Sequence, residues 1–307
     1  MNMREDDAAP LVDIGGRRLA LQCAGAGAPT VVFEAGLGCD STTWDTVFAD
    51  TAAITRTCRY DRAGLGASDP APTPRTARDM AHDLHALLAR AAAPPYVLVG
   101  HSFGGVIARL YAQLYTEEVA GLVLLDTVHP DETSRAAALL PPPETDEGDA
   151  VAAMRHALTR GRADPQGNAE GVDLAASNTQ LTEVASLGQI PLVSVGRSRY
   201  RFAPGFPEEL AARMRRLILD LRADLATLSS RGRFVLADES GHFIHHDRPD
   251  VALDAIRWVV EQWNKHEFIT LSARDSHIFV DTLLNPRGPN DALRAAFADC
   301  KEFTGER

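Results

Sequence analysis

Short apolar runs recur along the chain, and most of them are rich in β-branched or aliphatic residues at consecutive positions. They occupy residues 30–33, 96–99, 122–125, 190–195 and 233–236. A strand that is apolar on both faces is typical of a parallel sheet covered by helices. The runs therefore predict buried parallel strands, separated by segments long enough to hold helices.

The chain opens with a different pattern, in which apolar and polar residues alternate. Residues 11–14 and 19–23 both alternate, and Gly15 and Gly16, which tolerate positive φ, lie between them. This arrangement predicts a β-hairpin whose two strands lie at the edge of the sheet.

Helical periodicity fills the spaces between the predicted strands. Thr76 and Asp79 form a capping-box pair before an apolar stripe. The stripe consists of Met80, Leu84, Leu87 and Leu88. Similar stripes cover residues 210–228, behind Pro207, and residues 251–259. Alternating strands and helices predict an α/β fold, in which helices cover both faces of a mostly parallel sheet.

Residues 130–188 interrupt this alternation. The segment contains consecutive prolines at residues 141–143 and a short apolar stripe at residues 151–158, but it carries no strand signal. A segment of this kind between two sheet strands is typical of a functional loop. We therefore expect a small helical lid over about residues 130–188.

Composition and charge exclude several classes of protein. Hydrophobic residues make up 45% and charged residues 24% of the 307 positions, which is normal for a globular protein. The formal net charge is -11, whereas nucleic-acid binding needs clustered cations, so no nucleic-acid partner is expected. No run approaches the ~20 apolar residues that span a bilayer, and the acidic residues 1–10 do not resemble a secretory signal. We expect a cytoplasmic protein without a membrane span.

The cysteines are scattered and form no C-x-x-C pair. They are Cys23, Cys39, Cys58 and Cys300. Neither a zinc knuckle nor a dense disulfide framework is indicated. The sequence therefore predicts buried free thiols.

Residues 100–104, Gly-His-Ser-Phe-Gly, follow the buried run that ends at Val99 and precede a helical stretch at residues 106–115. A nucleophile on a sharp strand-to-helix turn needs small residues two positions before and after it, and it lies at a helix N-terminus that favours negative charge. Ser102 is therefore the predicted nucleophile. The alternative is a glycine-rich turn with an incidental serine.

A serine hydroxyl needs a base within hydrogen-bond reach, so a histidine on a loop after a late strand is expected. His242 lies in the segment Ser240-Gly-His-Phe-Ile244 and is predicted to be that base. The nearby His245 and His246 make a metal cluster conceivable, but no carboxylate or histidine spacing on one helix face supports it. We expect neither a metal nor a cofactor.

Three segments together resemble the α/β-hydrolase fold family of serine hydrolases over about residues 11–263. They are the turn at Ser102, the block around His242, and residues 60–68, Tyr-Asp-Arg-Ala-Gly-Leu-Gly-Ala-Ser. The last segment is similar to the family's D-x-x-G-x-G-x-S loop after the fourth strand. The resemblance implies an eight-stranded, mostly parallel sheet in a hydrolase domain of residues 1–265, and acyl-enzyme chemistry.

The resemblance also implies an oxyanion hole. Carried over by position, its donors are the N–H groups of Phe103, after the nucleophile, and of Leu37, in the loop after the third strand. Many relatives have His-Gly where this chain has Ala35-Gly36, so a side chain that usually braces this loop is missing. Because backbone donation needs only the turn, which Gly36 and Gly38 permit, we expect the hole to be kept. The alternative is a turn without catalytic duty.

In this family the acid that orients the histidine usually follows the seventh strand. Residues 196–200, Gly-Arg-Ser-Arg-Tyr, contain no carboxylate at that place. Some relatives use the end of the sixth strand, where Asp126 follows the run at residues 122–125. Asp126 is therefore predicted to complete a triad with Ser102 and His242. The alternative is a strand-end aspartate that binds backbone N–H groups.

Residues 266–307 extend beyond a normal hydrolase domain. A strand-like start precedes a capping box of Ser272 and Asp275 and two short helical stripes at residues 278–284 and 293–297. The segment is similar to the toxin-neutralising C-terminal part of ribbon-helix-helix antitoxins that pair with acetyltransferase toxins. Their DNA-binding ribbon has no counterpart here. We expect a helical tail that contacts the hydrolase domain, a second copy of the chain or a partner protein.

These observations predict a hydrolase that cleaves carboxylic esters of small molecules. An aminopeptidase or amidase of the same fold is an alternative that needs an acidic anchor for the substrate amine, and Asp40, Asp146 and Glu147 are available. A regulatory protein that acts through its tail is another alternative. Serine at position 102 excludes the covalent-aspartate mechanism of dehalogenases and epoxide hydrolases. Acyl and alcohol specificity depends on the shapes of the lid and pocket.

Overall fold

The computed structural model describes residues 9–143, 147–159, 164–267 and 281. The chain divides into two compact units, residues 1–264 and 265–307. The sheet and the helices that cover it belong to the first unit. Most of the second unit, including the capping box expected in the tail, lies outside the described residues.

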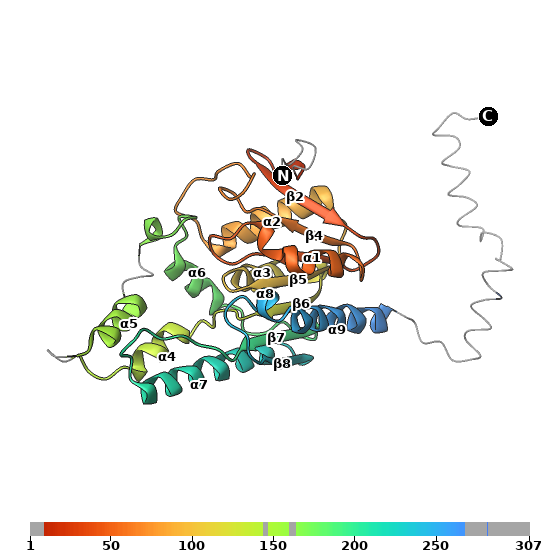
Figure 1. Cartoon of the computed structure of the whole chain (residues 1–307). Helices are drawn as coiled ribbons and strands as arrows, with labels where there is room; N and C mark the ends of the chain where they lie inside the picture. Colours follow the sequence, from red (N-terminus) through yellow and green to blue (C-terminus); the bar gives the residue numbers. More distant parts are fainter. Residues whose placement is uncertain (1–8, 144–146, 160–163, 268–280, 282–307) are drawn as a thin grey trace, which may run out of the picture. The chain divides into compact units, whose positions relative to one another are not determined.

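Across the described residues, eight strands form one sheet in the order β1-β2-β4-β3-β5-β6-β7-β8 (Figure 1). Their bounds are β1 (Leu11–Asp13), β2 (Arg18–Ala24), β3 (Thr30–Glu34), β4 (Thr57–Tyr60), β5 (Tyr96–His101), β6 (Val119–Leu125), β7 (Leu192–Arg197) and β8 (Gly232–Ala237). β2 pairs antiparallel with β1 and β4, and the remaining pairs are parallel. The opening hairpin and the parallel pairing of the five strands predicted from apolar runs are confirmed, but β8 is an edge strand whose side chains are mostly not buried, which corrects the prediction of burial for residues 233–236. β4 has no such run because Arg59 interrupts it.

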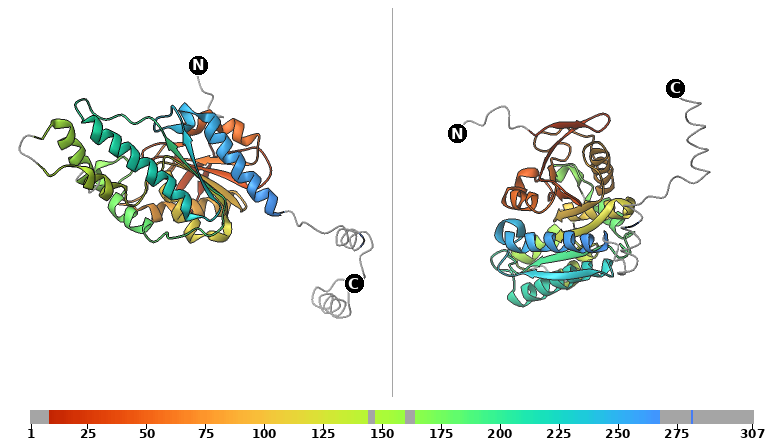
Figure 2. Two further views of the ribbon diagram at one scale, coloured as in Figure 1. Left: turned by 90° about the horizontal axis from the view of Figure 1, so that it is seen from below. Right: turned by 90° about the vertical axis from the view of Figure 1, so that its right-hand side faces the viewer.

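Helices cover both faces of the sheet (Figure 2). The helices of the described residues are α1 (Asp45–Ala52), α2 (Ala77–Ala91), α3 (Gly104–Leu114), α4 (Glu132–Leu139), α5 (Asp149–Thr159), α6 (Leu174–Leu181), α7 (Glu208–Asp224), α8 (Ile244–Asp247) and α9 (Pro249–Glu267), of which α4 and α5 lie in an insertion away from the sheet. Side chains alternate along the central strands, so that Val97 and Val99 pack with α1 and α9, while Tyr96 and Leu98 pack with α2 and α3. None of the described helices is long and apolar enough to cross a bilayer.

The longer helices match the predicted stripes. α2 begins at the capping box that Thr76 and Asp79 form, and α9 covers the stripe at residues 251–259. α7 follows Pro207 but ends at Asp224, because residues 225–228 tighten into a 3₁₀ turn. The pattern does not predict α1, α4 and α6, each of which spans only eight residues.

The segment between β6 and β7 is a helical insertion that carries α4, α5 and α6. α4 and α5 share an apolar cluster with α7 that is separate from the two cores beside the sheet. The cluster contains Ala136, Leu140, Val151, Leu210, Met214, Leu217 and Leu221. α6 packs instead with α2 and α3. The insertion is therefore attached to the sheet domain at two places.

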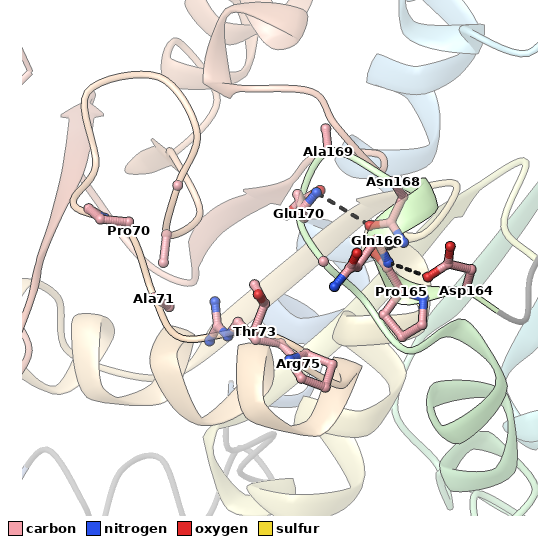
Figure 3. Close-up of a pocket in the computed structure, with 14 residues that line it drawn as sticks. Pro70, Ala71, Thr73, Arg75, Asp164, Pro165, Gln166, Asn168, Ala169 and Glu170 are labelled. Carbon is pink, nitrogen blue, oxygen red and sulfur yellow. Dashed lines mark hydrogen bonds between the residues drawn. The ribbon is translucent and has the colours of Figure 1, made fainter.

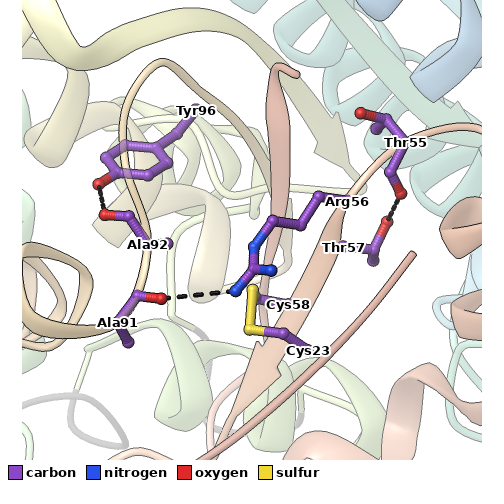
Figure 4. The surroundings of a disulfide bond; sticks show 8 residues. All are labelled: Cys23, Thr55, Arg56, Thr57, Cys58, Ala91, Ala92 and Tyr96. Atoms are coloured by element: carbon purple, nitrogen blue, oxygen red, sulfur yellow. Dashed lines mark hydrogen bonds between the residues drawn. A yellow bond between two sulfur atoms is a disulfide. The ribbon is translucent and has the colours of Figure 1, made fainter. Parts of the chain in front are cut away.

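Cys23 and Cys58 form a disulfide with an S–S distance of 2.05 Å, which corrects the prediction of free thiols for this pair (Figure 4). The two residues lie directly opposite each other on the antiparallel strands β2 and β4, with their Cα atoms 4.1 Å apart. The two cysteines are 35 positions apart in the chain, and the segment between them carries β3, which lies on the other side of β4. The sequence around each cysteine does not reveal this neighbourhood, so the pairing could not be predicted locally. Cys39 keeps a free thiol.

Candidate functional site

Ser102 lies on a tight turn between β5 and α3, in a left-handed backbone conformation with φ of 53°. Its N–H donates a hydrogen bond to the Leu125 carbonyl on the neighbouring strand at 3.0 Å. A Cβ at Gly104 would lie only 2.1 Å from the Glu34 carbonyl oxygen, and a Cβ at Gly100 would lie 2.5 Å from the Gly105 Cα. The two glycines of the motif are thus required by the close approach of other backbone, as the sequence predicts for a nucleophile turn.

Ser102 lines a cavity of about 110 Å³ together with Leu37 and Phe103. The other lining residues are Val106, Val128, Leu174, Ser177, Asn178 and Leu181. In the described part of the chain, the backbone N–H groups of Leu37 and Phe103 donate to no other group. The loop that carries Leu37 lies against the serine, because a Cβ at Gly36 would come within 3.5 Å of the Ser102 Cβ. Two unused donors therefore flank the hydroxyl-bearing residue.

A buried ionic network fixes this loop. The Arg62 guanidinium donates to the carbonyl oxygens of Ala35 at 2.6 Å and Gly36 at 2.7 Å, and it forms ion pairs with Glu34 and Glu170 at 2.7 Å each. Burial raises the pKa of Glu34, which the positive charge of Arg62 opposes. This network braces the loop, which has Ala35 where the resemblance in sequence implies a histidine. The sequence gives no local signal for it, because Glu170 belongs to the insertion.

The buried Asp126 and the partly exposed His242 form a hydrogen-bonded pair. The His242 Nδ1 atom lies 2.6 Å from Asp126 Oδ2, so this hydrogen bond joins the end of β6 to the loop after β8. Arg222, on α7, donates from Nε to Asp126 Oδ1 at 3.1 Å, and Arg197 Nε lies 3.1 Å from Asp126 Oδ2. Burial alone raises the pKa of Asp126, but the bond to His242 and the two arginine charges outweigh it and lower that pKa to about 2. Asp126 is therefore ionised at neutral pH.

The two arginines are site residues that sequence reasoning missed. Arg197 ends β7, the strand after which the resemblance in sequence would lead one to expect a carboxylate, and Asp126 lies at the end of the neighbouring strand β6. Arg222 also pairs with Glu132 of α4 at 2.7 Å. The sequence shows that residues 196–200 contain no carboxylate. It does not show that Arg197 and Arg222 form ion pairs with Asp126.

His101, next to Ser102, connects the turn to the His242 loop. Its Nε2 atom lies 2.9 Å from the His242 carbonyl oxygen, and the two rings are 4.6 Å apart. Burial lowers the pKa of His101 to about 3, so its ring is neutral. In the described residues the Ser102 hydroxyl makes no hydrogen bond to the His242 ring. The structure thus joins Asp126 to His242 by a hydrogen bond. Ser102 follows His101 in the chain, and His101 contacts His242 directly.

His245 and His246, which follow His242 closely in the chain, contact the loop before α1. His245 Nε2 lies 3.1 Å from the Thr43 hydroxyl, and its ring packs on Trp44 at 4.4 Å. His246 Nε2 lies 2.7 Å from the Thr43 carbonyl oxygen. Within the described residues, no group of three metal-binding side chains is close enough to hold an ion.

A larger cavity of about 570 Å³ lies between residues 63–75 and residues 164–171 of the insertion (Figure 3). Two of the acids considered as anchors for a substrate amine line neither this cavity nor the one at Ser102. Asp40 caps the 3₁₀ turn at residues 41–44 by accepting a hydrogen bond from the Thr42 N–H, and Glu147 pairs with Arg155. The third, Asp146, lies outside the described residues.

Comparison with known proteins places this site in a familiar fold. A family model described as the alpha/beta hydrolase fold matches residues 29–183. The chain is similar to the uncharacterized protein YqjL of Bacillus subtilis (strain 168), with 32% identity over 239 residues that cover 76% of this chain and 83% of that protein. A second model, described as Antitoxin TacA 1-like, matches residues 250–302 and so confirms the likeness of the tail that the sequence indicated.

Solved structures agree on the architecture. A thermophilic esterase from Thermogutta terrifontis superposes with a TM-score of 0.53 at 22% identity, covering 80% of this chain and 94% of the esterase. The enol-lactonase from Burkholderia xenovorans LB400 superposes with a TM-score of 0.55 at 19% identity, covering 82% of this chain and 100% of the lactonase. Both show the same fold around different reactions.

Proposed function

Because the chain belongs to the family with the alpha/beta hydrolase fold, we propose that this hydrolase is a serine enzyme that cleaves carboxylic esters of small molecules. Ser102 is the nucleophile, His242 the general base and acid, and Asp126 the residue that orients the imidazole. The N–H groups of Leu37 and Phe103 bind the oxyanion. The observation that carries the proposal is the cavity at Ser102 with its two unused backbone donors.

The residues support a two-step acyl transfer. The Ser102 oxygen attacks the ester carbonyl while its proton passes to His242 Nε2, and the negative charge of the tetrahedral intermediate is held by the two N–H groups. Collapse of the intermediate breaks the bond to the alkoxy oxygen, which leaves with the proton from His242. Water then attacks the acyl-enzyme by the same route and releases the acid.

The ionised Asp126 favours the imidazolium that forms in each step. Its hydrogen bond to Nδ1 leaves Nε2 as the atom that exchanges protons with Ser102. Catalytic hydrogen bonds are often long without substrate and tighten when it binds. In the proposed mechanism the His242 side chain, which is 36% exposed, turns toward the Ser102 hydroxyl when substrate binds.

An ester substrate is favoured over a peptide because two of the acids considered as anchors for a substrate amine line neither cavity. An aminopeptidase needs a free carboxylate to hold the substrate amine, whereas Asp40 and Glu147 are engaged by the protein itself. The cavity beside Ser102 is lined mainly by apolar side chains and suits a short acyl group.

A fluorophosphonate probe and a series of p-nitrophenyl esters of increasing acyl length test the proposal. Ser102→Ala should abolish labelling and lower ester turnover by at least about 10⁴-fold, because triad members act as a unit. Ser134→Ala, which removes an exposed hydroxyl on α4, is the matched control and should keep both activities. Labelling that persists in Ser102→Ala would refute the assignment.

The antitoxin-like match favours a second role for the tail, which is binding of a partner protein. Antitoxins of this kind act by contacting a protein, and the match includes α9 of the hydrolase domain as well as residues beyond it. Analytical ultracentrifugation of the full chain with an acetyltransferase toxin is the test. A complex with 1:1 or higher stoichiometry is expected, and separate sedimentation of the two proteins at micromolar concentration would contradict this role.

A further inference from the structure

A cavity of about 370 Å³ lies beside His242 and is distinct from the cavity at Ser102. Its walls are formed by Arg197, Arg199, Arg201, Gly241, His242 and Asp247. Three of the six lining residues are arginines, although the whole chain has a formal net charge of -11. A cluster of cations in an acidic chain marks the cavity as locally positive.

The three arginines differ in how far their charges are compensated. Arg197 pairs with the buried Asp126, and its guanidinium lies over the Tyr200 ring at 4.3 Å. Arg199 pairs loosely with Glu239, at 3.7 Å and with both side chains mostly exposed, so this pair contributes little. Arg201 is exposed and makes no ion pair with the described residues.

The acid in the cavity wall is already engaged. Asp247 Oδ2 accepts a hydrogen bond from the Gly241 N–H at 2.7 Å. Asp247 keeps its negative charge but forms no ion pair with Arg199 or Arg201, so these two guanidinium groups have no strong partner among the described residues. An anion that enters it meets two guanidinium groups that are free to donate.

The arginine segment has a fixed position relative to His242. The Arg199 N–H donates to the Ser240 carbonyl at 2.9 Å, and the Glu239 N–H donates to the Ser198 hydroxyl at 2.8 Å. On the other side, Phe202 packs against the apolar cluster that α4 and α5 share with α7. The segment is tied both to the loop that carries His242 and to the insertion, so that its backbone is preorganised for binding.

We propose that this cavity binds a carboxylate on the alcohol part of the ester, so that the preferred substrates are esters of hydroxy acids. The inference rests on the proposed function. His242 donates its proton to the leaving alkoxide, which places the alcohol part on the His242 side and the acyl part in the cavity at Ser102. Planar guanidinium groups match the two oxygens of a carboxylate, and Arg199 and Arg201 supply them.

A matched pair of substrates tests the inference. 4-Acetoxybenzoate carries the carboxylate, 4-acetoxybenzamide is its neutral counterpart, and 4-acetoxyphenyl phosphate offers a different anion. The measured quantity is the ratio of kcat/KM for the carboxylate to that for the amide. Arg201→Gln should lower this ratio about tenfold, the doubly substituted Arg199→Gln/Arg201→Gln should lower it further, and Arg201→Lys should restore part of it.

The control is Arg216→Gln on α7, which changes the net charge equally at an 80% exposed side chain outside the cavity and should leave the ratio unchanged. An unchanged ratio in the doubly substituted variant would overturn the inference, and a preference for the phosphate over the carboxylate would overturn its choice of anion.

Binding of the products gives a readout that does not depend on turnover. Calorimetry with 4-hydroxybenzoate and 4-hydroxybenzamide should show tighter binding of the carboxylate to the wild-type protein, and Arg201→Gln should remove that advantage. If neither ester is hydrolysed but the carboxylate binds through Arg201, the proposed function fails while the anion site stands. Equal binding of both products would overturn the site itself.

Discussion

Glu170 and Gly38 lie 132 positions apart in the chain and are joined by a hydrogen bond of 2.7 Å from the Gly38 N–H to Glu170 Oε1. The same carboxylate receives two bonds from the Arg62 guanidinium, at 2.7 Å each. Glu170 belongs to the insertion, whereas Gly38 follows the proposed oxyanion donor Leu37. The insertion therefore helps to hold the loop on which proposed catalysis depends.

Replacing Glu170 by glutamine should slow turnover more than it weakens substrate binding. The amide nitrogen would face N–H donors, so at least one of the three bonds is lost and the loop shifts. We expect kcat to fall about tenfold or more with a smaller change in KM, because a misplaced oxyanion donor affects the transition state most. Steady-state kinetics measure this.

The matched control is Glu183→Gln, which lies in the same insertion and removes a partly exposed ion pair with Arg78 of α2. It should change neither constant. A lower melting temperature of Glu170→Gln without any change in kcat would show that the network is only structural.

Replacing Asp126 by asparagine should affect both rate and stability. The rate should fall about 10⁴-fold because an amide holds the imidazole in the wrong tautomer. The free energy of unfolding should also fall, by about 3 kcal/mol, since Arg197 and Arg222 lose the anion they share. Adding Arg197→Gln should recover part of the stability but none of the turnover. A rate loss below tenfold in Asp126→Asn would move the orienting role to another residue.

The disulfide predicts a stability difference between oxidised and reduced protein. A cross-link that closes 35 residues stabilises the fold by about 3–4 kcal/mol in the chain-entropy model. Urea denaturation should show this loss in Cys23→Ser/Cys58→Ser, and wild-type protein with reductant should match it. Cys39→Ser, which removes a free thiol, is the control. Equal stability of the wild type with and without reductant would contradict the pairing.

The buried histidines predict destabilisation in mild acid. Burial lowers the pKa of His101 to about 3 and that of His245 to about 2. Between pH 6.5 and these values the unfolded chain binds protons that the folded chain does not, so the free energy of unfolding decreases as the pH falls. Protonation of each histidine in the unfolded chain should lower the free energy of unfolding by about 2 kcal/mol between pH 6.5 and pH 5. The ionised Asp126 adds its own loss only below about pH 4, because its folded pKa is the lower one.

Urea denaturation at several pH values checks this dependence. His245→Phe keeps a ring against Trp44 and should remove about half of the decrease. His156→Gln alters an exposed histidine on α5 and should keep the wild-type dependence. A decrease of equal size in His245→Phe and wild type would exclude His245 as a cause.

The features that could be predicted from the sequence depend mainly on interactions between residues that are close together in the chain. The capping box at Thr76 and the paired glycines of the opening hairpin each act between near neighbours in the chain. The strands β3, β5, β6 and β7 also have a local cause, because a strand buried on both faces must be apolar throughout. These elements were identified correctly, whereas β8 was found as a parallel strand but is partly exposed.

The remaining features depend on neighbours that only the folded chain brings together. Cys23 meets Cys58 because β2 lies next to β4, and Arg62 meets Glu170 across 108 positions. Arg197 becomes part of the candidate site only because β7 pairs with β6. The periodicity and spacing of the sequence do not reveal such contacts, because each residue fits its own strand or loop whether or not its distant partner is present.

Ser102 and Asp126 have positive φ values, 53° and 42°, in a region where most residues with a Cβ are strained. Glycine at position 102 would relieve the strain there, and it would also remove the hydroxyl proposed for chemistry. Asp126 differs, because its ion pairs stabilise the fold as well. Laboratory selection for heat tolerance alone should therefore favour loss of the serine. In nature, a lineage that no longer needs turnover is free to make the same substitution. The residue found at position 102 in any relative thus serves as a record of whether selection there still acts on activity.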